Sequence, residues 1–172
     1  LLVTVCLHED VLADFLDGFG GGTTRERTLA IMKDSHIGSY GVIGLICYFL
    51  LLLQLHHLPL GLLCILVLSG DCWSKFCASQ IVNYLPYARK EEDSKSKTVY
   101  NRMSRHELLA GFLCGLFPFV LLLPIKLWIA TLFPLLTFFL LYRLMKRRLQ
   151  GYTGDCCGAT FLLCEPVSYT HL

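Results

Sequence analysis

The chain has 172 residues, of which 55% are hydrophobic and only 16% are charged, and its formal net charge at pH 7 is +2. With a mean hydropathy of +0.57, it carries more apolar surface than a soluble domain of this length could bury. No Walker sequence, no GxSxG motif and no pattern of basic and aromatic residues indicates a nucleotide hydrolase or a nucleic-acid-binding protein. The composition predicts a polytopic membrane protein.

The first predicted element is a short acidic helix near the start of the chain. It carries the carboxylates of Asp10, Asp14 and Asp17, and helical steps of four and seven residues place them within an arc of about 60°. Negative charges this close repel one another unless a cation or a cationic substrate lies between them. The pattern favours a metal site, with a helix end whose acids are only solvated as the alternative.

A glycine-rich stretch and several basic residues follow this helix. We expect Gly20, Gly21 and Gly22 to form a flexible connection whose backbone N–H groups approach a ligand closely. Carboxylates for Mg²⁺, glycines for close approach and cations for phosphate are the groups that metal-assisted phosphoryl transfer requires. The cations predicted to neutralise phosphate, each with a membrane anchor as its alternative role, are Arg25, Arg27, Lys33 and Lys75.

Four uncharged apolar runs predict membrane-spanning helices, at residues 38–55, 58–68, 108–123 and 127–142. A helix needs about 20 residues to cross a hydrocarbon core of about 30 Å. The second run is too short, so we expect it to continue toward residue 85 as one longer helix, with a re-entrant segment as the alternative. Together the runs predict an all-α fold, a polytopic transmembrane helix bundle.

Basic residues are concentrated in alternate connections of this bundle. Residues 25–33, 75–105 and 143–148 hold clusters of them, whereas the intervening connections hold only Lys126. By the positive-inside rule the clusters lie in the cytoplasm. We therefore expect the acidic helix, the segment around Lys75 and the polar residues 151–155 to meet at the cytoplasmic face.

The nine cysteines include no CxxC pair, and most of them lie in apolar context. We expect small buried hydrophobic residues here rather than disulfides or zinc ligands.

Three groups of polar and glycine motifs follow one another in a fixed order along the chain. They comprise residues 8–10, 13–14 and 17–22, Arg25, Arg27, residues 31–35 and 37–38, Gly41, residues 85–89, residues 151–155 and 158–159, and Glu165. In order and spacing they resemble the cobalamin synthase family, also called adenosylcobinamide-GDP ribazoletransferase. Two positions depart from the family pattern, since Val11 stands where the family usually has glycine and Lys75 where arginine is common.

The resemblance implies a multi-pass transferase of the bacterial inner membrane with its active face toward the cytoplasm. Such an enzyme joins adenosylcobinamide-GDP to α-ribazole, or to α-ribazole 5′-phosphate, with Mg²⁺ as cofactor and GMP as the released product. The resemblance also implies that the protein is surrounded by membrane lipid and has no nucleic-acid partner. A homo-oligomer is possible under this resemblance.

Within this resemblance, we expect Asp10 and Asp14 to be the principal Mg²⁺ ligands, with Asp17 either completing the site or acting as the base. Asp10 and Asp17 are separated by about 10 Å along a helix, so a further ligand must come from another element, and Asp155 is the best candidate. His8 is the other candidate base. It would point away from the aspartates on a straight helix, so this role requires the helix to begin after it, and a hydrogen-bonded interfacial histidine is the alternative.

We expect residues 1–165 to form a single membrane transferase domain whose first seven residues are the tail of a truncated helix. Residues 166–172 interrupt an apolar run and are predicted to be a non-native tail, so Tyr169 and His171 receive no functional weight. Two other functions use similar groups. A CDP-alcohol phosphatidyltransferase would need a DGxxAR motif that is missing here, and a cation transporter would place its acidic residues near the bilayer midplane.

Overall fold

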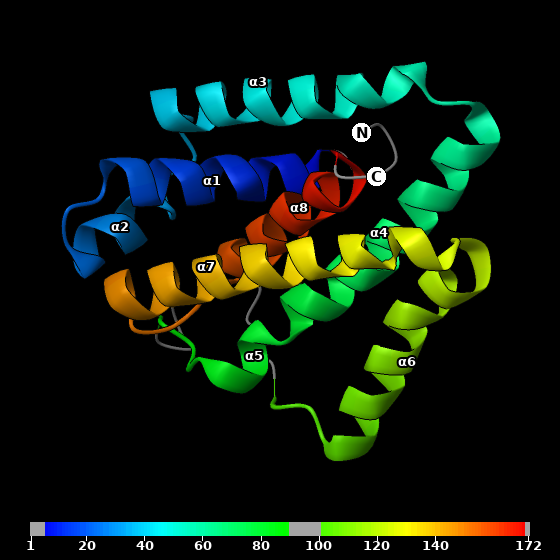
Figure 1. Cartoon of the computed structure of the whole chain (residues 1–172). Helices are drawn as coiled ribbons and strands as arrows, with labels where there is room; N and C mark the ends of the chain where they lie inside the picture. The colour runs from blue at the N-terminus through cyan, green and yellow to red at the C-terminus, as the bar shows by residue number, and fades with distance from the viewer. Residues whose placement is uncertain (1–5, 90–100, 171–172) are drawn as a thin grey trace.

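A computed structural model describes residues 6–89 and 101–170, and in this part of the chain the fold is helical (Figure 1). The all-α prediction is confirmed. The elements in chain order are α1 (Leu7–Gly21), α2 (Arg25–Ile31), α3 (Ser39–Leu53), the 3-10 helix η1 (Gln54–His57), α4 (Leu60–Ser79), α5 (Ile81–Tyr84), α6 (Arg105–Leu122), the 3-10 helix η3 (Ile125–Thr131), α7 (Leu132–Arg148) and α8 (Gly154–Thr170).

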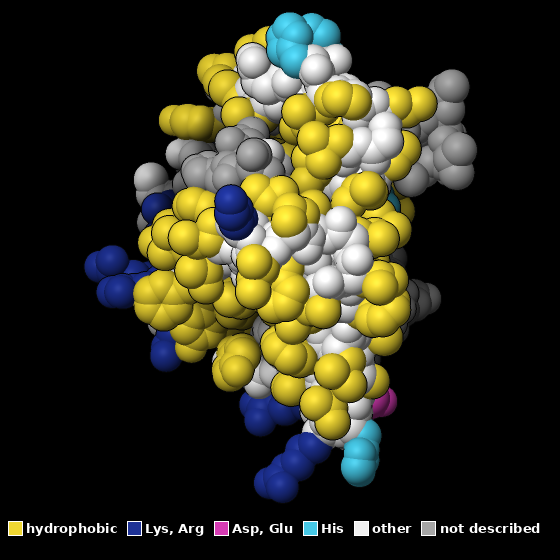
Figure 2. Space-filling model, turned by 45° about the vertical axis from the view of Figure 1, so that its right-hand side comes forward, with side chains coloured by type: hydrophobic (Ala, Val, Ile, Leu, Met, Phe, Trp, Pro, Cys, Tyr) yellow, Lys and Arg dark blue, Asp and Glu magenta, His cyan; other side chains and the backbone are white. Residues whose placement is uncertain are grey.

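Four helical segments in the described residues are long and apolar enough to cross a membrane, and they confirm the predicted spans. The second of them covers Leu60–Tyr84, so the short apolar run continues into a helical segment long enough to span the membrane. Many large apolar side chains on these segments are exposed, as expected for surfaces that contact lipid. In Figure 2, hydrophobic side chains cover most of one face and the basic side chains lie mainly at its edges.

Helix α8 holds the bundle together by packing against α1, α4 and α7, while α1 also packs against α2 and α3. One buried cluster includes Leu12 and Phe15 of α1 together with Met145, Cys156 and Leu162. A second cluster joins α4, α6 and α8 around Trp73, Phe119 and Cys164. The end of α1, the start of α3 and the end of α7 lie at the same end of the molecule, on the left of Figure 1.

Helix ends follow local sequence signals. Ser104 accepts a hydrogen bond from the Glu107 backbone N–H, and the Glu107 side chain accepts one from the Ser104 N–H, which forms a capping box at the start of α6. Thr24 caps α2 through the Arg27 N–H. Pro166, by contrast, does not end α8, which continues to Thr170. That residues 166–172 are a non-native tail stays a prediction.

The cysteines are less uniformly buried than expected. Cys77, Cys156 and Cys164 are buried, but Cys6, Cys47, Cys64 and Cys114 are exposed. The last three of these lie on α3, α4 and α6, among the apolar side chains of the spans. A thiol is apolar enough for such a surface, which explains why the sequence did not distinguish the two environments.

Helices α1 and α8 approach closely because small residues lie between them. A Cβ atom at Gly158 would lie 2.6 Å from a methyl group of Val11, and a branched side chain has little freedom to move aside. Val11, which departs from the family pattern, is thus accommodated by the missing side chain of Gly158.

We therefore predict that Gly158→Ala destabilises the protein by about 1–3 kcal/mol through overpacking. Gly61→Ala is the matched control, since a Cβ atom at Gly61 in α4 meets nothing within 4 Å. Thermal unfolding of the purified protein in detergent measures both, and adding Val11→Ala to Gly158→Ala recovers part of the loss. Equal stability of the two single variants would contradict the proposed contact.

Candidate functional site

Two polar loops that are distant in sequence lie side by side at one end of the bundle. The N–H of Ala88 donates to the carbonyl of Tyr152 at 2.8 Å, and the N–H of Tyr152 donates to the carbonyl of Pro86 at 2.9 Å. A Cβ atom at Gly151 would lie 2.6 Å from the Pro86 carbonyl oxygen, so this approach requires glycine there. The loops form a short parallel bridge between Tyr87 and Tyr152.

A buried ion pair fixes the start of α8 to the first of these loops. The Arg89 guanidinium lies 3.3 Å from Asp155 Oδ2, and the two side chains are only 6% and 10% exposed. The Thr153 hydroxyl also donates to Asp155 Oδ2 at 3.3 Å. Asp155, which we expected to complete a metal site, thus has a cationic partner that sequence reasoning did not assign to it.

Arg25 contacts backbone carbonyls of both loops. Its Nε donates to the Leu149 carbonyl at 2.7 Å and its Nη2 to the Ala88 carbonyl at 2.9 Å. Arg148, which sequence analysis treated only as one of a basic cluster, donates to the Gly22 carbonyl. These guanidinium groups connect the end of α1, the start of α2 and the two loops.

Asp17 contacts the start of α3. Its Oδ2 accepts a hydrogen bond from the Gly38 N–H at 2.7 Å, and its Oδ1 accepts one from the Gly41 N–H at 2.8 Å. The side chain is 6% exposed, and Cβ atoms at Gly38 and Gly41 would lie within 2.5 Å of its carboxylate oxygens. A carboxylate at a helix N-terminus satisfies free N–H groups and is stabilised by the helix dipole.

Asp10 and Asp14 lie on the same stripe of α1, one turn apart, Asp10 exposed and Asp14 partly buried. Within residues 6–89 and 101–170, the structure does not gather three His, Cys, Asp or Glu side chains into a metal-binding group. Two carboxylates still suit Mg²⁺, which is commonly held by one or two carboxylates together with water and substrate phosphate. The assignment of metal ligands stays a prediction.

His8 lies inside the helix, because α1 begins at Leu7. The condition that we set for a role as base, a helix beginning after His8, is therefore not met. Its ring packs edge-on against Phe161 of α8, with 5.7 Å between ring centroids. Lys75 Nζ lies 5.3 Å from the centroid of the same Phe161 ring and 2.8 Å from Asp71.

The glycine-rich stretch is not the flexible connection that we expected. Gly20 and Gly21 lie within α1, and Gly22 is its C-cap. A Cβ atom at Gly20 would lie 2.4 Å from the Tyr40 ring, and one at Gly22 would lie 2.1 Å from the Thr28 hydroxyl. These glycines allow α1 to pack closely against its neighbours.

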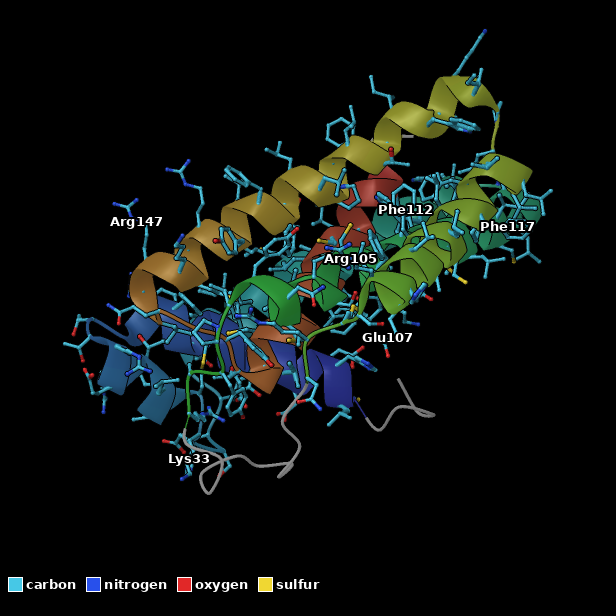
Figure 3. All side chains as sticks on the ribbon, turned by 90° about the horizontal axis from the view of Figure 1, so that it is seen from below. Lys33, Arg105, Glu107, Phe112, Phe117 and Arg147 are labelled. Atoms are coloured by element: carbon cyan, nitrogen blue, oxygen red, sulfur yellow. The ribbon has the colours of Figure 1, made fainter. Side chains whose placement is uncertain are left out.

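The remaining predicted cations lie on the outside of the molecule. Arg27 and Lys33 are both exposed. Lys33 and Arg147 lie toward the same end of the bundle, and Phe117 lies at the other (Figure 3). In the loop after Lys33, the His36 ring nitrogen lies 2.7 Å from Asp34. This hydrogen bond lowers the pKa of Asp34 and raises the pKa of His36.

Comparison with known proteins places these features in one family. The family model described as cobalamin-5-phosphate synthase matches residues 1–172. The chain belongs to this family. It is 35% identical to the adenosylcobinamide-GDP ribazoletransferase of Polaromonas sp., covering 100% of this chain and 68% of the relative. The chain is 37% identical to the enzyme of the same name from Vibrio parahaemolyticus, covering 100% of this chain and 66% of the relative. It is 40% identical to the enzyme from Shewanella amazonensis, covering 98% of this chain and 67% of the relative. No solved structure matches the chain.

Membership of the cobalamin-5-phosphate synthase family makes this a membrane-embedded transferase of cobalamin biosynthesis. The chain spans about two thirds of the length of the curated relatives. The motifs that carried the resemblance are the segments that the structure joins. Arg25 and Asp155 both bond to residues 85–89, and Asp17 bonds to the backbone of Gly41.

For this family member we predict that Asp17→Asn lowers the free energy of unfolding by about 1–3 kcal/mol. Asparagine has one side-chain acceptor oxygen and no charge, so one N–H at the start of α3 loses its partner. Thermal unfolding without added metal measures the change. The control is Glu26→Gln, which makes the same carboxylate-to-amide change at an exposed position in α2. A stability loss seen only with Mg²⁺ present would instead indicate a metal ligand.

Proposed function

We propose that this chain carries the active site of an adenosylcobinamide-GDP ribazoletransferase. The substrates are adenosylcobinamide-GDP and either α-ribazole or α-ribazole 5′-phosphate, and the products are the joined cobalamin, or its 5′-phosphate, and GMP. The observation that supports this most is the junction of the motifs at residues 85–89 and 151–155. This junction gives a membrane protein a rigid polar end beside the acidic helix.

The proposed reaction is a displacement at phosphorus. A hydroxyl oxygen of α-ribazole forms a bond to the phosphorus attached to cobinamide, and the bond from that phosphorus to the oxygen of GMP breaks. The hydroxyl proton passes to a base, and GMP leaves with the electron pair of the broken bond. The protein has to position the two substrates and offset the negative charge of the diphosphate.

Asp10 and Asp14 are the residues that we propose for Mg²⁺, which when bound would offset charge on the diphosphate and the leaving oxygen. Asp10 is exposed and Asp14 is partly buried one turn away, an arrangement that suits a site completed by substrate phosphate and water. Arg27 and Lys33, both exposed, would attract the anionic nucleotide end.

Asp17, Arg25 and Asp155 have positioning roles in this proposal. Each makes hydrogen bonds within the protein, which hold the end of α1 against α3, α2 against the loops, and α8 against residues 85–89. A site that must be held to within fractions of an ångström depends on such support. His8 lies inside α1 with its ring edge-on to Phe161, so it is a weak candidate for the base.

The proposed setting is the bacterial inner membrane, with the polar end of the bundle facing the cytoplasm. Arg147 and Arg148 in α7 and Arg105 in α6 lie at the ends of their spans. Basic residues at these ends support the orientation through the positive-inside rule.

Release of GMP from adenosylcobinamide-GDP tests the proposal. Membranes that carry the protein should release GMP when α-ribazole and Mg²⁺ are added, and Asp14→Asn should lower the rate by at least about 100-fold. Glu26→Gln, which changes an exposed carboxylate outside the proposed site, should leave the rate unchanged.

Two outcomes would contradict the proposal. Absence of GMP release by the unsubstituted protein would favour another membrane transferase or a transporter. Full metal-dependent release by Asp14→Asn would remove Asp14 from the site. The amount of folded protein, followed by thermal unfolding in detergent, separates a lost ligand from a lost fold.

A further inference from the structure

A cavity of about 310 Å³ lies between α4, α8 and the segment that precedes α6. Its wall is formed mainly by apolar atoms, and Phe161 of α8 contributes an aromatic ring. Its lining includes Lys75, Ala78, Val82, Met103, Cys157 and Phe161.

Among the residues that the structure describes, Lys75 is the cationic residue in the lining of this cavity. The Lys75 ammonium lies 5.3 Å from the centroid of the Phe161 ring, and its side chain is 61% exposed. Its partner Asp71 lies one helical turn away on α4, and exposed pairs of this kind contribute little stability. Lys75 can therefore exchange Asp71 for an anion on a bound molecule at small cost.

The cavity adjoins the proposed active site along α8. Cys157 follows Asp155 by two residues, and Phe161 lies one turn beyond Cys157 on the same face of the helix. The pair of Arg89 and Asp155 fixes the start of α8, so it also fixes this wall of the cavity.

We propose that the cavity binds α-ribazole, with its aromatic base among the apolar side chains and its 5′ end toward Lys75. This inference rests on the function proposed above. A cavity of about 150 Å³ lined by apolar residues holds benzene, so a cavity of about twice that volume has room for a fused two-ring base.

The other parts of the substrates fit this cavity poorly. The corrinoid ring of adenosylcobinamide-GDP is far larger than the cavity. Guanine has a size close to that of the ribazole base, but its edge carries several hydrogen-bond donors and acceptors. Ser79 and Asn101 contribute polar side chains to the lining, but its surface is mainly apolar and would leave most of these groups without partners.

Lys75 predicts which form of α-ribazole is favoured. In Lys75→Gln, kcat/KM for α-ribazole 5′-phosphate should fall about tenfold relative to kcat/KM for α-ribazole, because a charge-assisted contact to the phosphate is lost. Lys126→Gln, at an exposed lysine in η3, should leave this ratio unchanged. An equal fall in kcat/KM for α-ribazole and for α-ribazole 5′-phosphate would overturn the placement of the 5′ end beside Lys75.

Filling the cavity tests the placement of the base. Val82→Phe should raise KM for α-ribazole at least about tenfold, with KM for adenosylcobinamide-GDP unchanged. The matched control is Val120→Phe, at a position in α6 that is 48% exposed. An unchanged KM for α-ribazole, or a rise in KM for adenosylcobinamide-GDP instead, would overturn the proposal.

A gentler substitution serves if Val82→Phe does not fold. Phe161→Leu keeps an apolar side chain but removes the ring, and it should raise KM for α-ribazole several-fold. Phe117→Leu, at a residue that is 61% exposed, is its control. Normal GMP release with an unchanged KM for α-ribazole in both cavity variants would disprove the cavity assignment alone, whereas no release by the unsubstituted protein would disprove the proposed function.

Discussion

The guanidinium group of Arg25 connects three parts of the chain that are far apart in sequence. Its two hydrogen bonds reach the carbonyls of Ala88 and Leu149, which lie 63 and 124 residues away. Helix α2 has only seven residues, too few to be stable alone, so these contacts and its packing on α1 hold it in place. Hydrogen bonds from a charged donor contribute about 1.5–3 kcal/mol each, which makes Arg25 a large part of that support.

The bilayer explains why hydrogen bonds between non-helical segments are concentrated at one end of the bundle. Within hydrocarbon every backbone polar group needs a partner inside the protein, and a continuous helix provides one for each. The loops at residues 85–89 and 149–153 are not helical, so their N–H and carbonyl groups bond to one another and to Arg25. The buried charge of Arg89 is balanced by Asp155 in the same place.

The fold was largely predictable from the sequence because each span depends on local composition. The apolar runs and the continuation of the second run to Tyr84 needed only a count of residues against the thickness of the hydrocarbon core. The cap of α6 is a local signal of the same kind, with Ser104 three residues before Glu107.

The candidate site was less predictable because its contacts join residues that are distant in sequence. Residue type alone suggested phosphate contacts for Arg25 and a flexible loop for Gly20. The structure instead gives Arg25 two backbone carbonyls and places Gly20 in a helix against the Tyr40 ring. The sequence placed three aspartates on one stripe of α1, but it did not reveal that Asp17 meets the start of α3.

The three aspartates of α1 therefore share a stripe but differ in environment. Asp17, at the end nearest α3, has both carboxylate oxygens bonded to backbone N–H groups and is almost inaccessible to solvent. Asp10, two turns earlier, is exposed. A carboxylate held by fixed N–H groups orients the helix that carries it, whereas an exposed one can take up a cation that arrives with substrate. On the proposed function, Asp17 sets the position of α1 so that Asp10 and Asp14 can meet Mg²⁺ and the diphosphate together.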